Sequence, residues 1–186
     1  MTDGGGMARA QRASPAAART TPAAALVARL TGRPPVPLTV ETLLDDHLVQ
    51  RWLCDELEAV ADGLPGLPPP DVIRRLCDRI LWITGTHFAR AEAIFRNLPP
   101  GCGPAPAALE ALCRMHRLDE VHAQDLVAML WRQASGRAQA GAGGGASADV
   151  GQLAYMLRCF FDGGRRAIAL KESWIADGRA PASARA

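Results

Sequence analysis

The sequence predicts an all-α fold, an up-down-up-down four-helix bundle, and three observations lead to this prediction. Four segments of about 20 to 30 residues place apolar side chains at steps of three and four, the period of an amphipathic helix. Short stretches rich in Gly and Pro, or in Gly and Ala, separate these segments. No stretch has the alternating pattern of a strand. Long helices with short connections favour an antiparallel bundle.

The first helix is expected at about 39–62, where Thr39 or Thr42 can cap its N-terminus and acidic residues in the first turns suit the helix dipole. The sequence GLPGLPPP at 63–70 ends it. The second helix is expected at about 71–97 with Asp71 as its cap. Gly85 lies inside this helix, which predicts a bend or a close backbone approach there.

The third helix is expected at about 106–134, after a second loop rich in Pro and Gly. Residues 134–147, ASGRAQAGAGGGAS, predict a flexible linker because Gly and Ala dominate them. The fourth helix is expected at about 148–177, and the pair Gly163-Gly164 is expected to interrupt or kink it.

Length and composition favour one domain with tails. The 186 residues are 48% apolar, which is typical of a globular protein. We expect a disordered N-terminal tail at 1–36, the bundle at 37–177 and a C-terminal tail at 178–186. A net charge of +2 gives no argument for nucleic acid as a partner, and no apolar run is long enough to cross a membrane.

The cysteines give no sign of a zinc site or a disulfide framework. The five cysteines show no CxxC spacing, and four of them lie inside the helical patterns. An odd count favours a reducing compartment, so we expect a cytoplasmic protein. The segment between Gly4 and Val40 has five arginines and no acid, a pattern that also occurs in transit peptides, and this alternative stays open.

Three of the four histidines fall on the apolar rows of the helices. His87 shares a row with Leu76, Ile80, Ile83, Ala91, Ile94 and Leu98. His47 and His116 lie on the inward faces of the first and third helices, and Glu120 follows His116 by one turn. Glu172 can also turn inward on the fourth helix. Imidazole and carboxylate groups at one depth suit iron, manganese or zinc, so the sequence predicts a metal site.

Four stretches, DDHLVQRWLCDELEAVADGL, THFARAEAIF, MHRLDEVHAQDL and RRAIALKESW, resemble the hemerythrin-like (HHE cation-binding) family over about 41–177. The resemblance implies a non-haem iron site with one or two ions. The implied metal ligands are His47, His87, Glu92, His116, Glu120 and Glu172. Ala91 stands where the family has a carboxylate on the second helix, with Glu92 following, and Ala167 stands where it has a histidine on the fourth.

The resemblance implies a sensor or carrier of oxygen, nitric oxide or iron rather than an enzyme, with the metal ion and a small diatomic molecule as ligands. The remaining ligands best support one metal, held by His47, His87 and Glu172. Two alternatives stay open. The departures at Ala91 and Ala167 favour a metal-free bundle that acts as a protein-interaction or regulatory module. A di-iron oxidase or peroxidase would need a second metal and an open coordination position.

Overall fold

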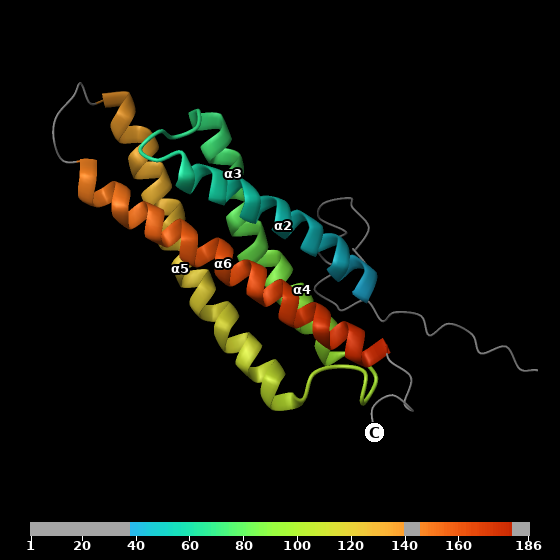
Figure 1. Cartoon of the computed structure of the whole chain (residues 1–186). Helices are drawn as coiled ribbons and strands as arrows, with labels where there is room; N and C mark the ends of the chain where they lie inside the picture. The colour runs from blue at the N-terminus through green and yellow to red at the C-terminus, as the bar shows by residue number, and fades with distance from the viewer. Residues whose placement is uncertain (1–37, 140–145, 180–186) are drawn as a thin grey trace, which may run out of the picture. The chain divides into compact units, whose positions relative to one another are not determined.

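A computed structural model describes residues 38–139 and 146–179. Over these residues the protein is all-α, with four helices that pack against one another and no strand (Figure 1). The expected N-terminal tail at 1–36, linker residues 140–145 and residues 180–186 of the expected C-terminal tail lie outside the described residues. None of the described helices has a stretch long and apolar enough to cross a membrane.

The first helix, α2, spans Val40–Asp62, close to the predicted range. Thr39 is its N-cap residue, and its side-chain oxygen accepts a hydrogen bond from the backbone N–H of Thr42 at 3.2 Å. This bond satisfies one of the backbone donors that the first turn of a helix leaves unpaired. Of the two threonines that the sequence offers as caps, Thr39 therefore has this role.

The second helix consists of α3 (Pro70–Trp82), a π-helical turn η1 (Ile83–His87) and α4 (Phe88–Arg96), which follow one another without a loop. Asp71 is not its cap, as the sequence had suggested. The N-cap is Pro69, and Asp71 lies in the first turn, where it accepts a hydrogen bond from Arg75 at 2.7 Å. A proline at the first helical position has no N–H, so the first turn has one fewer backbone donor to leave unpaired.

The irregularity expected near Gly85 is the π-helical turn. A π turn carries one extra residue, so it changes which side chains of the helix face the core beyond it. Gly85 is exposed, and a Cβ built on it would have no neighbour within 4 Å. The glycine therefore marks a change of helical geometry rather than a close backbone approach.

The third helix, α5, spans Pro106–Gln139, and the fourth, α6, spans Ala146–Arg179. Both are longer than predicted, since α5 continues into the expected linker and α6 into the expected C-terminal tail. The expected interruption at Gly163-Gly164 is absent, because α6 is continuous through both glycines. Instead, a Cβ on Gly164 would lie 3.1 Å from Cys54 Sγ of α2, which runs beside α6 (Figure 1).

The two glycines of α6 should therefore respond differently to alanine. A Cβ on Gly163 would meet nothing within 4 Å, so Gly163→Ala should raise the free energy of unfolding by about 0.5–1 kcal/mol through helix propensity. Gly164→Ala should lose that gain, because the Cys54 thiol must move away. Urea unfolding of both variants measures the difference, and equal gains would show that α2 and α6 do not touch at Gly164.

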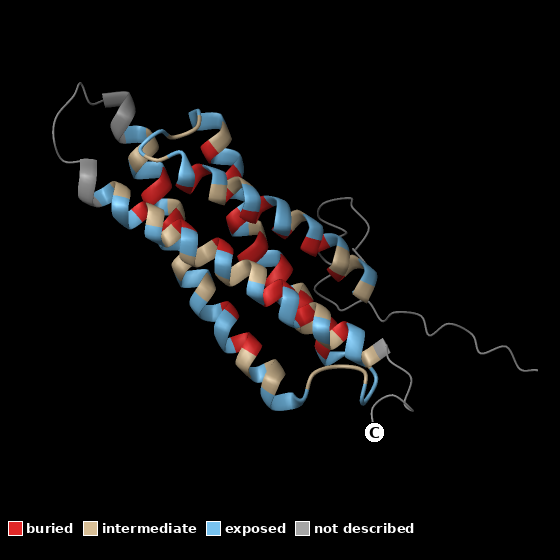
Figure 2. Cartoon of the chain, in the orientation of Figure 1, coloured by how far each residue is buried: buried red, intermediate tan, exposed pale blue. Residues whose placement is uncertain are grey.

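Buried residues occur along all the helices (Figure 2), and the apolar ones form two clusters at different levels of the helices. The larger cluster includes Leu53, Ile80, Leu126 and Leu157. The smaller cluster contains Leu43, Ala91, Ile94, Phe95, Leu112 and Ile175. Each of the four helices, with α3, η1 and α4 taken together as the second, thus contributes to both clusters. The residues between the two contributions of a helix lie at an intermediate level.

Candidate functional site

Four of the buried polar side chains lie between the two apolar clusters and form one group. They are His47 on α2, His87 at the end of η1, His116 on α5 and Lys171 on α6. His87 connects the group, because its ring centroid lies 5.5 Å from that of His47 and its Nε2 lies 2.9 Å from Lys171 Nζ. The Phe88 ring stacks on His116 at 3.9 Å between centroids, and Lys171 Nζ lies 5.9 Å from the Phe88 ring centre. A polar layer therefore crosses the helical core.

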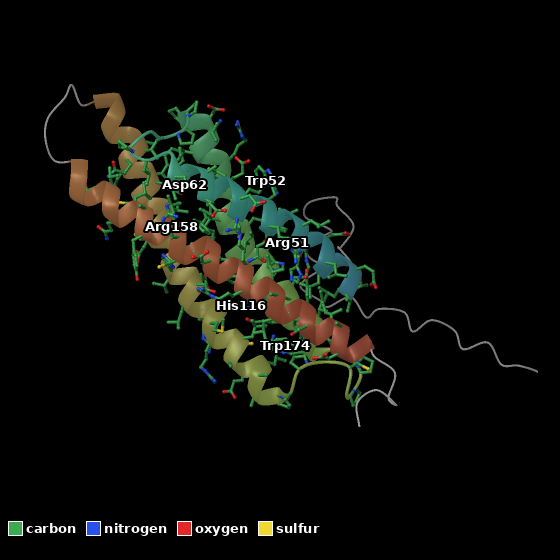
Figure 3. The ribbon with its side chains drawn as sticks, viewed as in Figure 1. Arg51, Trp52, Asp62, His116, Arg158 and Trp174 are labelled. Atoms are coloured by element: carbon green, nitrogen blue, oxygen red, sulfur yellow. The ribbon has the colours of Figure 1, made fainter. Side chains whose placement is uncertain are left out.

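Each histidine is held by a carboxylate from another helix. His47 Nδ1 lies 3.0 Å from Glu172 Oε1, and His87 Nδ1 lies 3.3 Å from Asp46 Oδ2. His116 Nδ1 lies 3.0 Å from Glu92 Oε1 (His116 is labelled in Figure 3). A hydrogen bond at Nδ1 fixes the ring orientation and leaves Nε2 of each ring as the other polar atom.

Each of these carboxylates is also paired with an arginine. Arg51 donates to both oxygens of Glu172 at 2.9 and 2.6 Å (Arg51 is labelled in Figure 3). Arg90 donates to both oxygens of Asp46, each at 2.7 Å. Arg96 donates to Glu92 Oε2 at 2.8 Å. The described residues thus contain three hydrogen-bonded series of the same kind. In each, a carboxylate binds an imidazole on one side and a guanidinium group on the other, and we call them the three relays.

Electrostatics keeps the imidazoles neutral and the carboxylates charged. Burial, together with the nearby Lys171, lowers the pKa of His47, His87 and His116 to about 4 each, although the carboxylate beside each ring opposes the shift. The hydrogen bonds from Arg51 and His47 lower the pKa of Glu172. Burial raises the pKa of Asp46 and Glu92, but the hydrogen bonds they accept outweigh it and both values are lowered.

These protonation states determine the tautomer of each ring. A charged carboxylate can only accept, so Nδ1 of each neutral imidazole carries the proton and donates it. Nε2 of each ring is then a lone-pair acceptor. At His87 this acceptor receives a hydrogen bond from Lys171 Nζ at 2.9 Å. Within the described residues the Nε2 atoms of His47 and His116 have no hydrogen-bond partner, although both are buried.

Lys171 is the largest fully buried side chain of the described residues. Burial lowers its pKa to about 8, while the carboxylates of Asp119, Asp46 and Glu172 raise it in part. At neutral pH the amine is therefore an ammonium ion with three N–H donors. A positive charge lies in the core beside the histidines.

The structure confirms some of the predicted site residues as inward and corrects others. His47, His87 and His116 are buried, as their helical rows predicted. Glu120 is exposed, so its predicted inward orientation is wrong; with Glu92 and His116 it lines a surface pocket beside the π turn. Asp119, one residue earlier, is half-buried. A helix buries one stripe only, and on α5 that stripe passes through Asp119 instead of Glu120.

The two carboxylates Glu92 and Glu172 are half-buried, and each binds the Nδ1 atom of a histidine from the outside. Ala91 and Ala167, which depart from the family pattern, are both buried. At these two inward positions the core therefore contains methyl groups. The carboxylates of Glu92 and Glu172 lie farther out, on the Nδ1 side of the imidazoles.

Sequence reasoning missed Lys171 and Asp46. Lys171 is three residues after Ile168 and four before Ile175, both of which are buried, so its position on the apolar row was visible in the sequence. Asp46 was interpreted as an acidic residue of the first turns that suits the helix dipole. Its partners, His87 and Arg90, are 41 and 44 residues away, and no local pattern predicts such a contact.

The residues present do not fit a metal ion well. Over residues 38–139 and 146–179, no group of three or more His, Cys, Asp or Glu side chains is arranged so that it could hold one. The unpartnered Nε2 atoms of His47 and His116 are suitable donors, but the acceptor of His87 is taken by an ammonium group. A cation that donates hydrogen bonds repels a metal ion at the same place.

Comparison of the chain with models of protein families, with curated proteins and with solved structures gives no match.

Proposed function

We propose that this chain is a hemerythrin-like up-down-up-down bundle that works without iron, as a protein-interaction or regulatory module. The observation that carries the proposal is the hydrogen bond from Lys171 Nζ to His87 Nε2 at 2.9 Å. It places a fixed positive charge against the imidazole that the resemblance implies as a metal ligand. The buried methyl groups of Ala91 and Ala167 support the same proposal, because neither can coordinate a metal.

The second candidate is the iron-binding sensor or carrier that the family resemblance implies. One observation favours it. Histidines that bind metals commonly donate their other ring N–H to a carboxylate, and all three inward histidines do this. The unpartnered Nε2 atoms of His47 and His116 could then face the metal.

The metal content of the full-length protein distinguishes the two candidates. We expect protein made in iron-supplemented medium, and then treated anaerobically with ferrous iron, to retain less than about a tenth of an equivalent of iron after desalting. Its melting temperature should be the same with and without ferrous iron, because a ligand that binds only the folded state would raise it. One or two equivalents of iron, lost in His87→Ala, would instead establish the second candidate.

A further inference from the structure

A surface groove of about 490 Å³ lies between α5 and α6, which are side by side (Figure 1). Two large apolar side chains, two charged side chains and three small residues line it: Met115, Leu170, Asp119, Arg166, Cys159, Gly163 and Ala167. Met129 of α5 and Met156 of α6 line a second pocket farther along the same pair of helices. Rising numbers on α5 thus correspond to falling numbers on α6, so the two helices are antiparallel.

The apolar walls of the groove are exposed. Met115 is 41% exposed and Leu170 is 38% exposed, and Leu118, three residues after Met115, is 71% exposed. Gly163 and Ala167 are small, so they leave the space between the two walls open. Exposed apolar side chains that gather round a hollow are typical of surfaces that bind another protein.

The two charged side chains of the groove lack a counter-ion. Asp119 and Arg166 are both half-buried, yet within the described residues neither forms a hydrogen bond or an ion pair. A charge that is partly removed from water costs free energy unless an opposite charge approaches it. The groove therefore favours a partner that brings a basic side chain to Asp119 and an acidic side chain to Arg166.

The charged and the apolar residues lie at matching levels of the two helices. Asp119 follows Met115 by one turn of α5, and Arg166 precedes Leu170 by one turn of α6. Because the helices are antiparallel, both steps have the same direction along the groove. Asp119 and Arg166 therefore lie across the groove from each other at one level, and Met115 and Leu170 do so one turn away.

A second copy of the chain meets these requirements. A two-fold axis along the groove places α5 of one copy against α6 of the other. Asp119 of each copy then faces Arg166 of the other copy, and Met115 of each copy faces Leu170 of the other, so a single rotation satisfies both kinds of contact. We infer that this groove is the interface of a symmetric homodimer, in which α5 and α6 of the two copies form an intermolecular four-helix bundle.

The dimer goes beyond the proposed function and does not depend on it. The groove is lined by side chains other than the three histidines and Lys171 of the polar layer. The mass of the protein in solution and its iron content are separate measurements, so the two proposals fail independently of each other.

Sedimentation equilibrium of the full-length chain should give twice its mass of 19.7 kDa at about 100 µM. Asp119→Arg places arginines opposite each other at both contacts, and Arg166→Asp places aspartates there, so each should raise the dissociation constant at least about tenfold. An equimolar mixture of the two variants restores opposite charges and should form a heterodimer. The double variant should dimerise like the wild type, because Asp119 faces Arg166 rather than another Asp119.

Leu170→Gln tests the apolar contact and should also raise the dissociation constant at least about tenfold. The matched controls are Leu48→Gln and Arg74→Asp, since both side chains are exposed on other helices, and neither should change the dissociation constant. Circular dichroism shows which variants fold. If Asp119→Arg does not fold, Arg166→Asp and Leu170→Gln decide the question.

Two results would overturn the inference. The first is a wild-type chain that stays monomeric at about 100 µM, which would leave the groove to a helix of a different protein. The second is a dimer whose dissociation constant is the same in the wild type, Arg166→Asp and Leu170→Gln, because such a dimer would use another surface.

Discussion

Acidification from pH 6.5 to pH 4 should destabilise this protein by at least about 3 kcal/mol. The pKa values of His47, His87 and His116 are lowered from 6.5 to about 4 in the folded protein. Between these two pH values the unfolded chain binds protons that the folded chain excludes. Stability is therefore complete above pH 6.5 and is lost as the pH falls towards 4.

The magnitude follows from the size of the shift. One pKa unit corresponds to about 1.4 kcal/mol, so one histidine alone contributes about 3 kcal/mol. The three side chains are fully buried or nearly so, and solvent therefore screens little of this effect. The three charges also repel one another and Lys171, so protonating one opposes protonation of the next. The lowered pKa values of Asp46, Glu92 and Glu172 act in the same direction at still lower pH.

Urea unfolding at a series of pH values between 4 and 7 measures this loss. His116→Asn, which removes one buried imidazole, should flatten the dependence on pH. His122→Asn is the matched control, because His122 is half-buried on the same helix and packs against Phe160, outside the polar layer. A free energy of unfolding that is the same at pH 4.5 and pH 7 would mean that the imidazoles are not buried as neutral groups.

The helices of this protein were predictable because apolar residues recur with the helical period along each of them. The row that contains Leu76, Ile80 and Ile83 predicted that His87 is buried, and it is. The end of α5 was not predictable in the same way. Residues such as Gln133 and Arg137 suit a helix or a linker equally, so the local sequence did not determine where α5 ends.

The composition of the polar layer was only partly predictable, for a physical reason. Periodicity gives the direction of a side chain to within about one residue step of 100°. That resolution was sufficient for the three histidines but not for choosing Asp119 over Glu120 on α5. The relays depend on contacts between helices that are far apart in the sequence. For that reason the sequence indicated Glu92 and Glu172 as possible ligands, but it did not predict that they bind the Nδ1 atoms of the histidines.

Asp46→Ala should be the most damaging single substitution in the polar layer, at about 3–5 kcal/mol of unfolding free energy. Asp46 accepts hydrogen bonds from Arg90 on both oxygens and from His87 on one. Without this carboxylate, the guanidinium group, which is largely buried, loses its counter-charge, and the Nδ1–H donor of His87 is left without a partner. Both losses leave a polar group desolvated and unpaired, which costs more than the net value of the original bonds.

Two variants separate this effect from a general sensitivity of α2. Asp45→Ala changes the preceding carboxylate, which is exposed, and should alter stability by less than about 0.5 kcal/mol. Asp46→Asn keeps an acceptor for one donor but loses the charge, and it should fall between Asp45→Ala and Asp46→Ala. Urea unfolding at pH 7 gives all three values. If the free energy of unfolding of Asp46→Ala is within about 1 kcal/mol of the wild-type value, Arg90 and His87 must form hydrogen bonds with water or other groups. The relay through Asp46 would then not be what stabilises the contact between α2 and the π turn.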